Sequence, residues 1–142
     1  MTEEDKTTIR VILCKLNEKA AVVEMEDSLR AMQELVGGPI EEYMPWEDEV
    51  AIICNEEGKM NGLTLNRAVR DENGCILDVI AGDFFICYAP IESESFLSMP
   101  PEIEEKYLRK FEKPERFYRD NDFIIQKKWE PEKKESVRDY ER

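Results

Sequence analysis

The chain has 142 residues, a formal net charge of −13 and no histidine. Its length suits one hydrophobic core, and its negative charge works against direct binding to the phosphate backbone of nucleic acids. Without histidine, Ser-His-Asp and Cys-His catalytic sites are excluded, and we expect neither an enzyme nor a metal or other cofactor. The charge is uneven, because residues 1–98 hold 21 acidic and 8 basic side chains.

The N-terminal sequence MTEEDKTT is acidic and polar, unlike the basic start and apolar run of a secretory signal. No stretch approaches the roughly 18–20 consecutive apolar residues that a membrane-spanning helix needs. We therefore expect a cytoplasmic protein, in the host cytoplasm if a phage encodes it, with no membrane partner.

The four cysteines lie far apart and form no CxxC pair. Cys14, Cys54 and Cys87 lie in apolar strings, so they are predicted to be buried thiols that behave as small hydrophobic residues. Cys75 lies beside a turn and is the candidate reactive thiol.

The first elements along the chain are predicted to be two strands and a helix. Residues 9–14 and 21–25 are β-branched and apolar, which favours a β-hairpin. Asp27 stands where a helix N-cap belongs, apolar residues then recur at helical spacing, and Gly37 ends the helix. The apolar face is short, so this helix is expected to lie on a sheet.

Four further strands are predicted in the middle of the chain. Residues 39–44 suit an edge strand because they begin at a proline, and residues 50–54 are apolar throughout, as in a central strand. Residues 55–70 are predicted to be a loop with a short helical or extended piece. The Asn73-Gly74 pair favours a tight hairpin turn before strands at 75–81 and 84–89.

A second helix is predicted after Ser98, its candidate N-cap, and is expected to end at Pro114. Residues 113–142 are charged with scattered aromatic residues, and residues 123–129 suit another strand or a partner-facing patch. We expect an acidic α+β domain over residues 1–112 and a charged C-terminal extension over 113–142. The predicted fold is a single domain with a twisted, largely antiparallel sheet, one helix packed across it and a C-terminal helix.

The candidate binding residues form a basic island between Asn55 and Gly74. No lysine or arginine occurs between Arg30 and Lys59, and the cations of the island are accompanied by asparagines. Arginine and asparagine suit phosphate or carboxylate groups, and if residues 65–70 are helical, the two arginines share a face. The candidate ligand-binding residues are therefore Asn55, Lys59, Asn66, Arg67 and Arg70.

A structural role for this island is the alternative, because an acidic surface offers both arginines many carboxylate partners. Glu56, Glu57, Asp71, Glu72 and Asp78 are the candidate partners. Trp46 raises a similar choice between anchoring a partner protein and packing under a helix, and we expect it to be packed.

Three segments, IRVILC, LRAMQELVGGPIE and AIICNEEGKMNGLTLNRAVRDENGCILDVIAGDFFI, carry a resemblance to a known family. Over residues 8–111 the chain resembles a family of domains of unknown function from bacteriophages and conjugative elements of low-GC Gram-positive bacteria. The resemblance implies a phage or mobile-element accessory gene and no particular reaction.

The leading functional hypothesis is a non-enzymatic accessory binding protein that sequesters an anionic, nucleotide-derived signal of host immunity, with a homo-oligomer interface as a candidate location. The alternative is an acidic decoy that mimics DNA and occupies a host DNA-binding or restriction enzyme. A hydrolase that uses Asp78 or Asp83 with Lys59 is a third reading, which nothing in the spacing selects.

Overall fold

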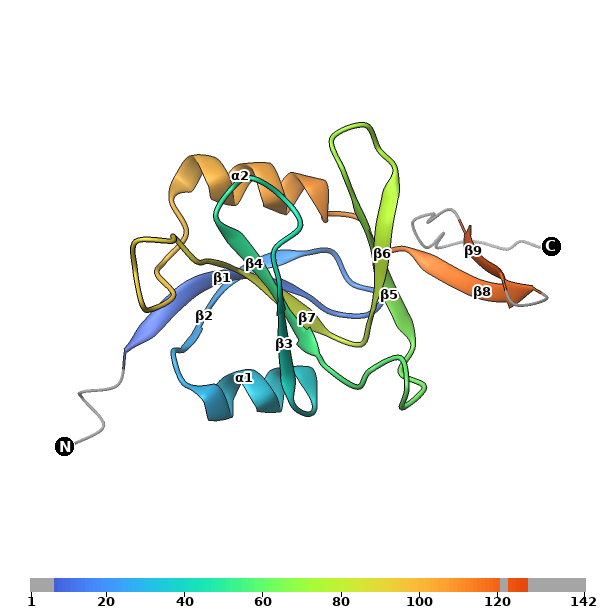
Figure 1. The fold of residues 1–142 in the computed structure, drawn as a ribbon, viewed down its shortest axis with the longest axis horizontal. Helices are drawn as coiled ribbons and strands as arrows, with labels where there is room; N and C mark the ends of the chain where they lie inside the picture. The colour runs from blue at the N-terminus through green and yellow to red at the C-terminus, as the bar shows by residue number, and fades with distance from the viewer. Residues whose placement is uncertain (1–6, 121–122, 128–142) are drawn as a thin grey trace, which may run out of the picture.

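The main sheet of the structure has five antiparallel strands in the order β2-β1-β7-β4-β3 (Figure 1). The structure, a computed structural model, describes residues 7–120 and 123–127. The strands are β1 (Thr8–Cys14), β2 (Ala21–Glu26), β3 (Ile40–Tyr43), β4 (Val50–Asn55) and β7 (Phe84–Tyr88). The predicted α+β fold with a largely antiparallel sheet is confirmed, and β3 is the edge strand that its proline indicated.

The two helices, α1 (Leu29–Val36) and α2 (Pro101–Lys110), cover opposite faces of this sheet (Figure 1). Alternation along β7 places Phe85 in the core under α1, and Phe84 and Ile86 in the core under α2. Burying such side chains contributes roughly 1.5–3 kcal/mol each. The sheet is therefore buried on both faces, which explains why β4 is apolar from Val50 to Cys54.

The ends of the helices differ from the predicted caps. The side chain of Ser28, not Asp27, accepts the backbone N–H of Ala31 at the start of α1, and Gly37 ends this helix with φ +83° as expected. Helix α2 begins at Pro101 without a side-chain cap, because its N-cap residue is Pro100, which has no side-chain acceptor. Ser98 lies before this position, and its hydroxyl accepts the N–H of Arg10 from β1.

The segment from residue 65 to 81 forms a second antiparallel pair, β5 (Leu65–Arg70) and β6 (Ile76–Ala81), joined by a turn with Gly74 at φ +84°. The helical option for residues 65–70 is therefore wrong, and Arg67 and Arg70 do not share a helix face. The predicted strand within residues 123–129 is confirmed as β9 (Phe123–Lys127), which pairs with β8 (Arg116–Asp120). Neither helix of the described ranges has the length and apolar character needed to cross a membrane.

Trp46 lies in the loop between β3 and β4 and packs under α2. Its ring centroid is 5.0 Å from that of Tyr107 and 5.9 Å from that of Phe111, and its Nε1 donates to the carbonyl of Arg70 at 2.8 Å. Asp48 of the same loop accepts hydrogen bonds from Lys106 and from the Tyr107 hydroxyl, which lower the pKa of this carboxyl group. The expectation that Trp46 is packed under a helix is met.

The positions of the cysteines predict selective labelling. Cys14, Cys54 and Cys87 are buried and Cys75 is exposed, and burial raises the pKa of the Cys14 and Cys54 thiols to about 12. Because the thiolate is the reactive form, a maleimide should label the native protein at Cys75 alone, and all four thiols only in denaturant. Mass spectrometry after a short exposure checks this, and native labelling of Cys87 would contradict it.

Candidate functional site

Arg67 is fully buried and binds main-chain oxygens instead of carboxylates. Its guanidinium donates to the carbonyls of Phe111 (3.1 Å), Lys15 (3.4 Å) and Glu18 (2.7 Å). It also donates to Oδ1 of Asn66 at 2.7 Å. Burial lowers the pKa of Arg67. The side chain thus joins β5 to the β1–β2 turn and to the end of α2.

Asn66, also fully buried, is the extra residue of a β-bulge where the β5–β6 register shifts. Its amide group donates to the carbonyls of Cys14 (3.0 Å) and Gly82 (2.8 Å). Its oxygen accepts from Arg67, so both ends of the amide have partners inside the protein. A bulge redirects a side chain, and here it turns Asn66 toward the main sheet.

Arg70 pairs with Glu115, a residue beyond the expected boundary at 112. Its Nη1 lies 2.8 Å from one carboxylate oxygen of Glu115, and the other oxygen accepts the backbone N–H of Ala68 at 2.8 Å. Glu115 therefore neutralises Arg70 and satisfies a donor on the outer edge of β5. The arginine has a carboxylate partner, as the structural alternative supposed, but not one of the five candidates.

Asn55 organises the turn after β4. Its amide nitrogen donates to the carbonyl of Val36 at 3.2 Å, and its oxygen accepts the N–H of Glu57 at 2.8 Å. Gly38 packs against the same amide, where an added Cβ would lie 2.9 Å from the nitrogen. Asn55 thereby ties the end of α1 to the loop that carries Lys59.

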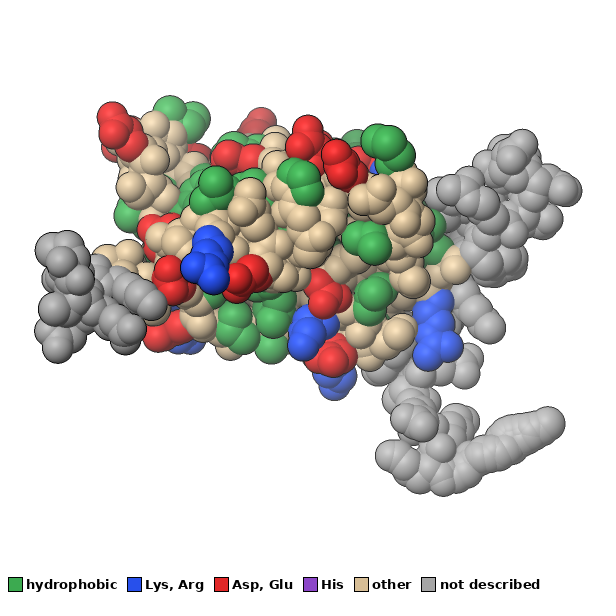
Figure 2. Space-filling view, turned by 90° about the horizontal axis from the view of Figure 1, so that it is seen from below, with side chains coloured by type: hydrophobic (Ala, Val, Ile, Leu, Met, Phe, Trp, Pro, Cys, Tyr) green, Lys and Arg blue, Asp and Glu red, His purple; other side chains and the backbone are tan. Residues whose placement is uncertain are grey.

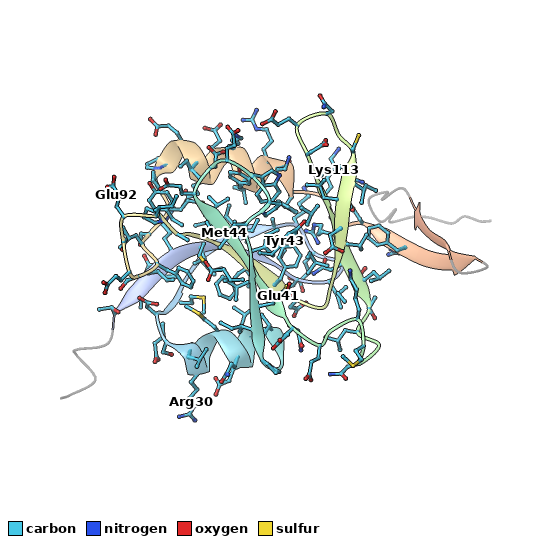
Figure 3. All side chains as sticks on the ribbon, viewed as in Figure 1. Arg30, Glu41, Tyr43, Met44, Glu92 and Lys113 are labelled. Atoms are coloured by element: carbon cyan, nitrogen blue, oxygen red, sulfur yellow. The ribbon has the colours of Figure 1, made fainter. Side chains whose placement is uncertain are left out.

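A cleft of about 280 Å³ opens between β3, the end of β4 and β6, and we call it the β3–β6 cleft. In Figure 3, Glu41 and Tyr43 lie along β3, the strand that bounds the cleft opposite β6. Of the predicted binding residues, Asn55 and Lys59 line the cleft, and Asn66, Arg67 and Arg70 do not. The described residues that line the cleft are Glu41, Tyr43, Cys54, Asn55, Glu56, Lys59, Met60, Asp78, Val79, Ile80 and Ala81.

Lys59 and Asp78 meet across the cleft. The ammonium nitrogen of Lys59 lies 2.5 Å from Oδ1 of Asp78, and that oxygen also accepts the N–H of Val79 at 2.7 Å. Gly58 allows this contact, because it lies so close to β6 that an added Cβ would be 3.1 Å from the carbonyl oxygen of Ala81. Both side chains remain partly exposed, at 53% for Lys59 and 40% for Asp78.

The electrostatic character of the β3–β6 cleft is negative. Glu41, Glu56 and Asp78 line it, and Lys59 is the one basic side chain among the described lining residues. Partial burial and the charges of Asp78 and Glu41 raise the pKa of the Tyr43 phenol, so it stays protonated and can donate a hydrogen bond. Val79, Ile80 and Ala81 are also among the lining residues, which gives the cleft a mixed polar and apolar lining.

Sequence reasoning did not place Tyr43 or Cys54 at a site. Asp78 had entered as a candidate partner of the arginines and, together with Lys59, as a candidate pair for a hydrolase, and the structure brings Asp78 and Lys59 together. Acidic pairs such as Glu41 and Glu42 are common in this chain, so two neighbouring acidic residues did not indicate a binding site. Throughout the described ranges, no group of three His, Cys, Asp or Glu side chains is arranged to hold a metal ion.

The fold and the β3–β6 cleft together define the chain as a small antiparallel α+β domain with a mixed polar and apolar cleft at one edge of its main sheet. The chain belongs to the family described as a domain of unknown function (DUF3846), which matches residues 9–112. This agrees with the resemblance over residues 8–111. No curated protein and no solved structure matches the chain.

Proposed function

We propose that this chain is a non-enzymatic binding protein, an accessory protein of a phage or mobile element, that holds a small molecule in the β3–β6 cleft. The observation that supports this is the cleft itself, where an aromatic ring, apolar side chains and an ion pair converge. Ligand sites typically combine a concave, largely apolar lining with a few placed polar groups. Pockets for drug-sized ligands measure roughly 300–1,000 Å³. Because the β3–β6 cleft measures about 280 Å³, its ligand is expected to be small.

An anionic, nucleotide-derived ligand has less support than a neutral or cationic one. Arg67 and Arg70 are engaged by carbonyls and by Glu115, which leaves Lys59 as the cation of the cleft. An anion there would face three carboxylates, and like charges at short distance are unfavourable. We therefore propose that a host signal sequestered by this protein is neutral or cationic, not anionic.

The alternative function, an acidic decoy that imitates DNA, has less support than ligand binding in the cleft. Exposed glutamates lie on β2 (Glu24) and on β3 (Glu41 and Glu42), which are the two opposite edges of the main sheet. Figure 2 shows acidic side chains spread over one face of the molecule, with lysines and arginines among them. A decoy that imitates DNA would gather its carboxylates on one side.

Calorimetry with ligands of three charge classes tests the proposed function. Cyclic di-AMP and ADP-ribose are the anions, adenosine is neutral, and 2-phenylethylamine and agmatine are cations. We expect one of these classes to bind at one site per chain, and Tyr43→Ala to weaken that binding about tenfold because it removes the ring that lines the cleft.

Tyr88→Ala is the matched control, since Tyr88 is half-buried on β7 outside the cleft. Mass spectrometry of the recovered ligand should find it unchanged. The absence of binding to every compound would contradict the proposed function, and a chemically altered ligand would replace it with an enzymatic one.

A further inference from the structure

We propose that the ligand of the β3–β6 cleft is a small organic cation, an amine or guanidine with an apolar body, and that Lys59 occupies the cation's position in the free protein. This inference rests on the proposed function and names the class of its ligand. It differs from the anion site expected from the sequence, because here Lys59 competes with the ligand instead of holding it.

The position for a cation is built around Asp78. Its Oδ1 accepts both the Lys59 ammonium group at 2.5 Å and the N–H of Val79 at 2.7 Å, which fixes the carboxylate against β6. Glu41 and Glu56 line the same cleft. A ligand ammonium or guanidinium group that entered would find the carboxylate already oriented, and charge-assisted hydrogen bonds of this kind are among the stronger ones.

Lys59 can give up this position at low cost. The ion pair is half exposed, and exposed ion pairs contribute little to stability. Lys59 lies in the turn segment between β4 and β5, next to Met60, whose side chain is 82% exposed. A lysine on such a segment can swing its ammonium group into solvent without disturbing the core.

The rest of the cleft suits an apolar body attached to the cation. Tyr43 and Ile80 line it together with Asp78, and an aromatic face also attracts a cation. A strongly hydrated inorganic cation would make no use of these surfaces. An amphipathic amine of the size of 2-phenylethylamine would use both the carboxylate and the ring.

The experiment measures the affinities of three isosteric probes by calorimetry: 2-phenylethylamine, 2-phenylethanol and phenylacetate. We expect the wild-type protein to bind the amine at least about tenfold more tightly than the alcohol, and phenylacetate more weakly still. Asp78→Asn should weaken amine binding about tenfold, because the amide has no charge for the ligand. Lys59→Met should strengthen it severalfold, because the competing ammonium group is gone.

Lys19→Met is the matched control, since Lys19 is exposed on the β1–β2 turn and should leave all three affinities unchanged. Weaker amine binding by Lys59→Met, or a preference for phenylacetate, would overturn the inference, as would the failure of every probe to bind both the wild type and Lys59→Met. Binding of adenosine or cyclic di-AMP that Tyr43→Ala weakens would leave the proposed function standing while this inference fell.

Discussion

Replacing Arg67 with methionine is expected to lower the free energy of unfolding by roughly 3 kcal/mol or more. Methionine keeps most of the aliphatic volume but removes every donor of the guanidinium group. The carbonyl of Phe111 and Oδ1 of Asn66 are buried, and each would lose its partner. An unsatisfied buried polar group costs about 1–3 kcal/mol, and the link from β5 to the end of α2 would be lost as well.

Urea unfolding of Arg67→Met and Arg109→Met measures this effect with a matched control. Arg109 pairs with Glu105 on the exposed face of α2, with side-chain exposures of 74% and 70%, so its replacement should change stability by less than about 0.5 kcal/mol. Equal urea midpoints for the two variants would show that the buried guanidinium group is not a structural link. An Arg67 variant can therefore lose ligand binding because it unfolds, so its binding is to be compared with its measured stability.

Replacing Glu115 with alanine is expected to lower the free energy of unfolding by about 2 kcal/mol. The change leaves the N–H of Ala68, which is 3% exposed, without an acceptor, and it removes the carboxylate from Arg70. Glu115→Gln should lose less, because its amide oxygen still accepts a hydrogen bond.

Glu112→Ala is the control for this series, because Glu112 is exposed and lies three positions earlier. Thermal unfolding of the three variants should rank the control as the most stable and Glu115→Ala as the least. If Glu115→Ala unfolds at the temperature of the control, the hydrogen bonds of Glu115 to Ala68 and Arg70 do not stabilise the domain.

Both helices and most strands were predictable because they have local signatures, whereas residues 65–70 were left open between a helical and an extended piece and β8 was not predicted. The β-branched run of β1, the apolar run of β4, the glycine after α1 and the Asn-Gly turn between β5 and β6 all lie within a few residues of the elements that they define. The capping residues were placed less well, since Asp27 and Ser28 are both good N-caps and the choice depends on the path of the chain.

The contacts of the arginines in the basic island could not be predicted from the sequence, because their partners are far away along the chain. Arg67 binds oxygens 44, 49 and 52 residues away, and Arg70 pairs with a carboxylate 45 residues away. Local spacing suggested an exposed cationic face, whereas β5 carries these residues against the main sheet. The β3–β6 cleft was missed for the same reason, since its walls come from separate hairpins.

One measurement tests most directly whether binding occurs at the β3–β6 cleft and not at the arginines. In ¹H–¹⁵N correlation spectra titrated with 2-phenylethylamine, we expect the largest shifts at the amides of Tyr43, Cys54, Val79 and Ala81. The amides of Asn66 and Arg67 should be nearly unchanged. Shifts centred on Asn66, Arg67 and Arg70, or no shifts at the cleft, would contradict it.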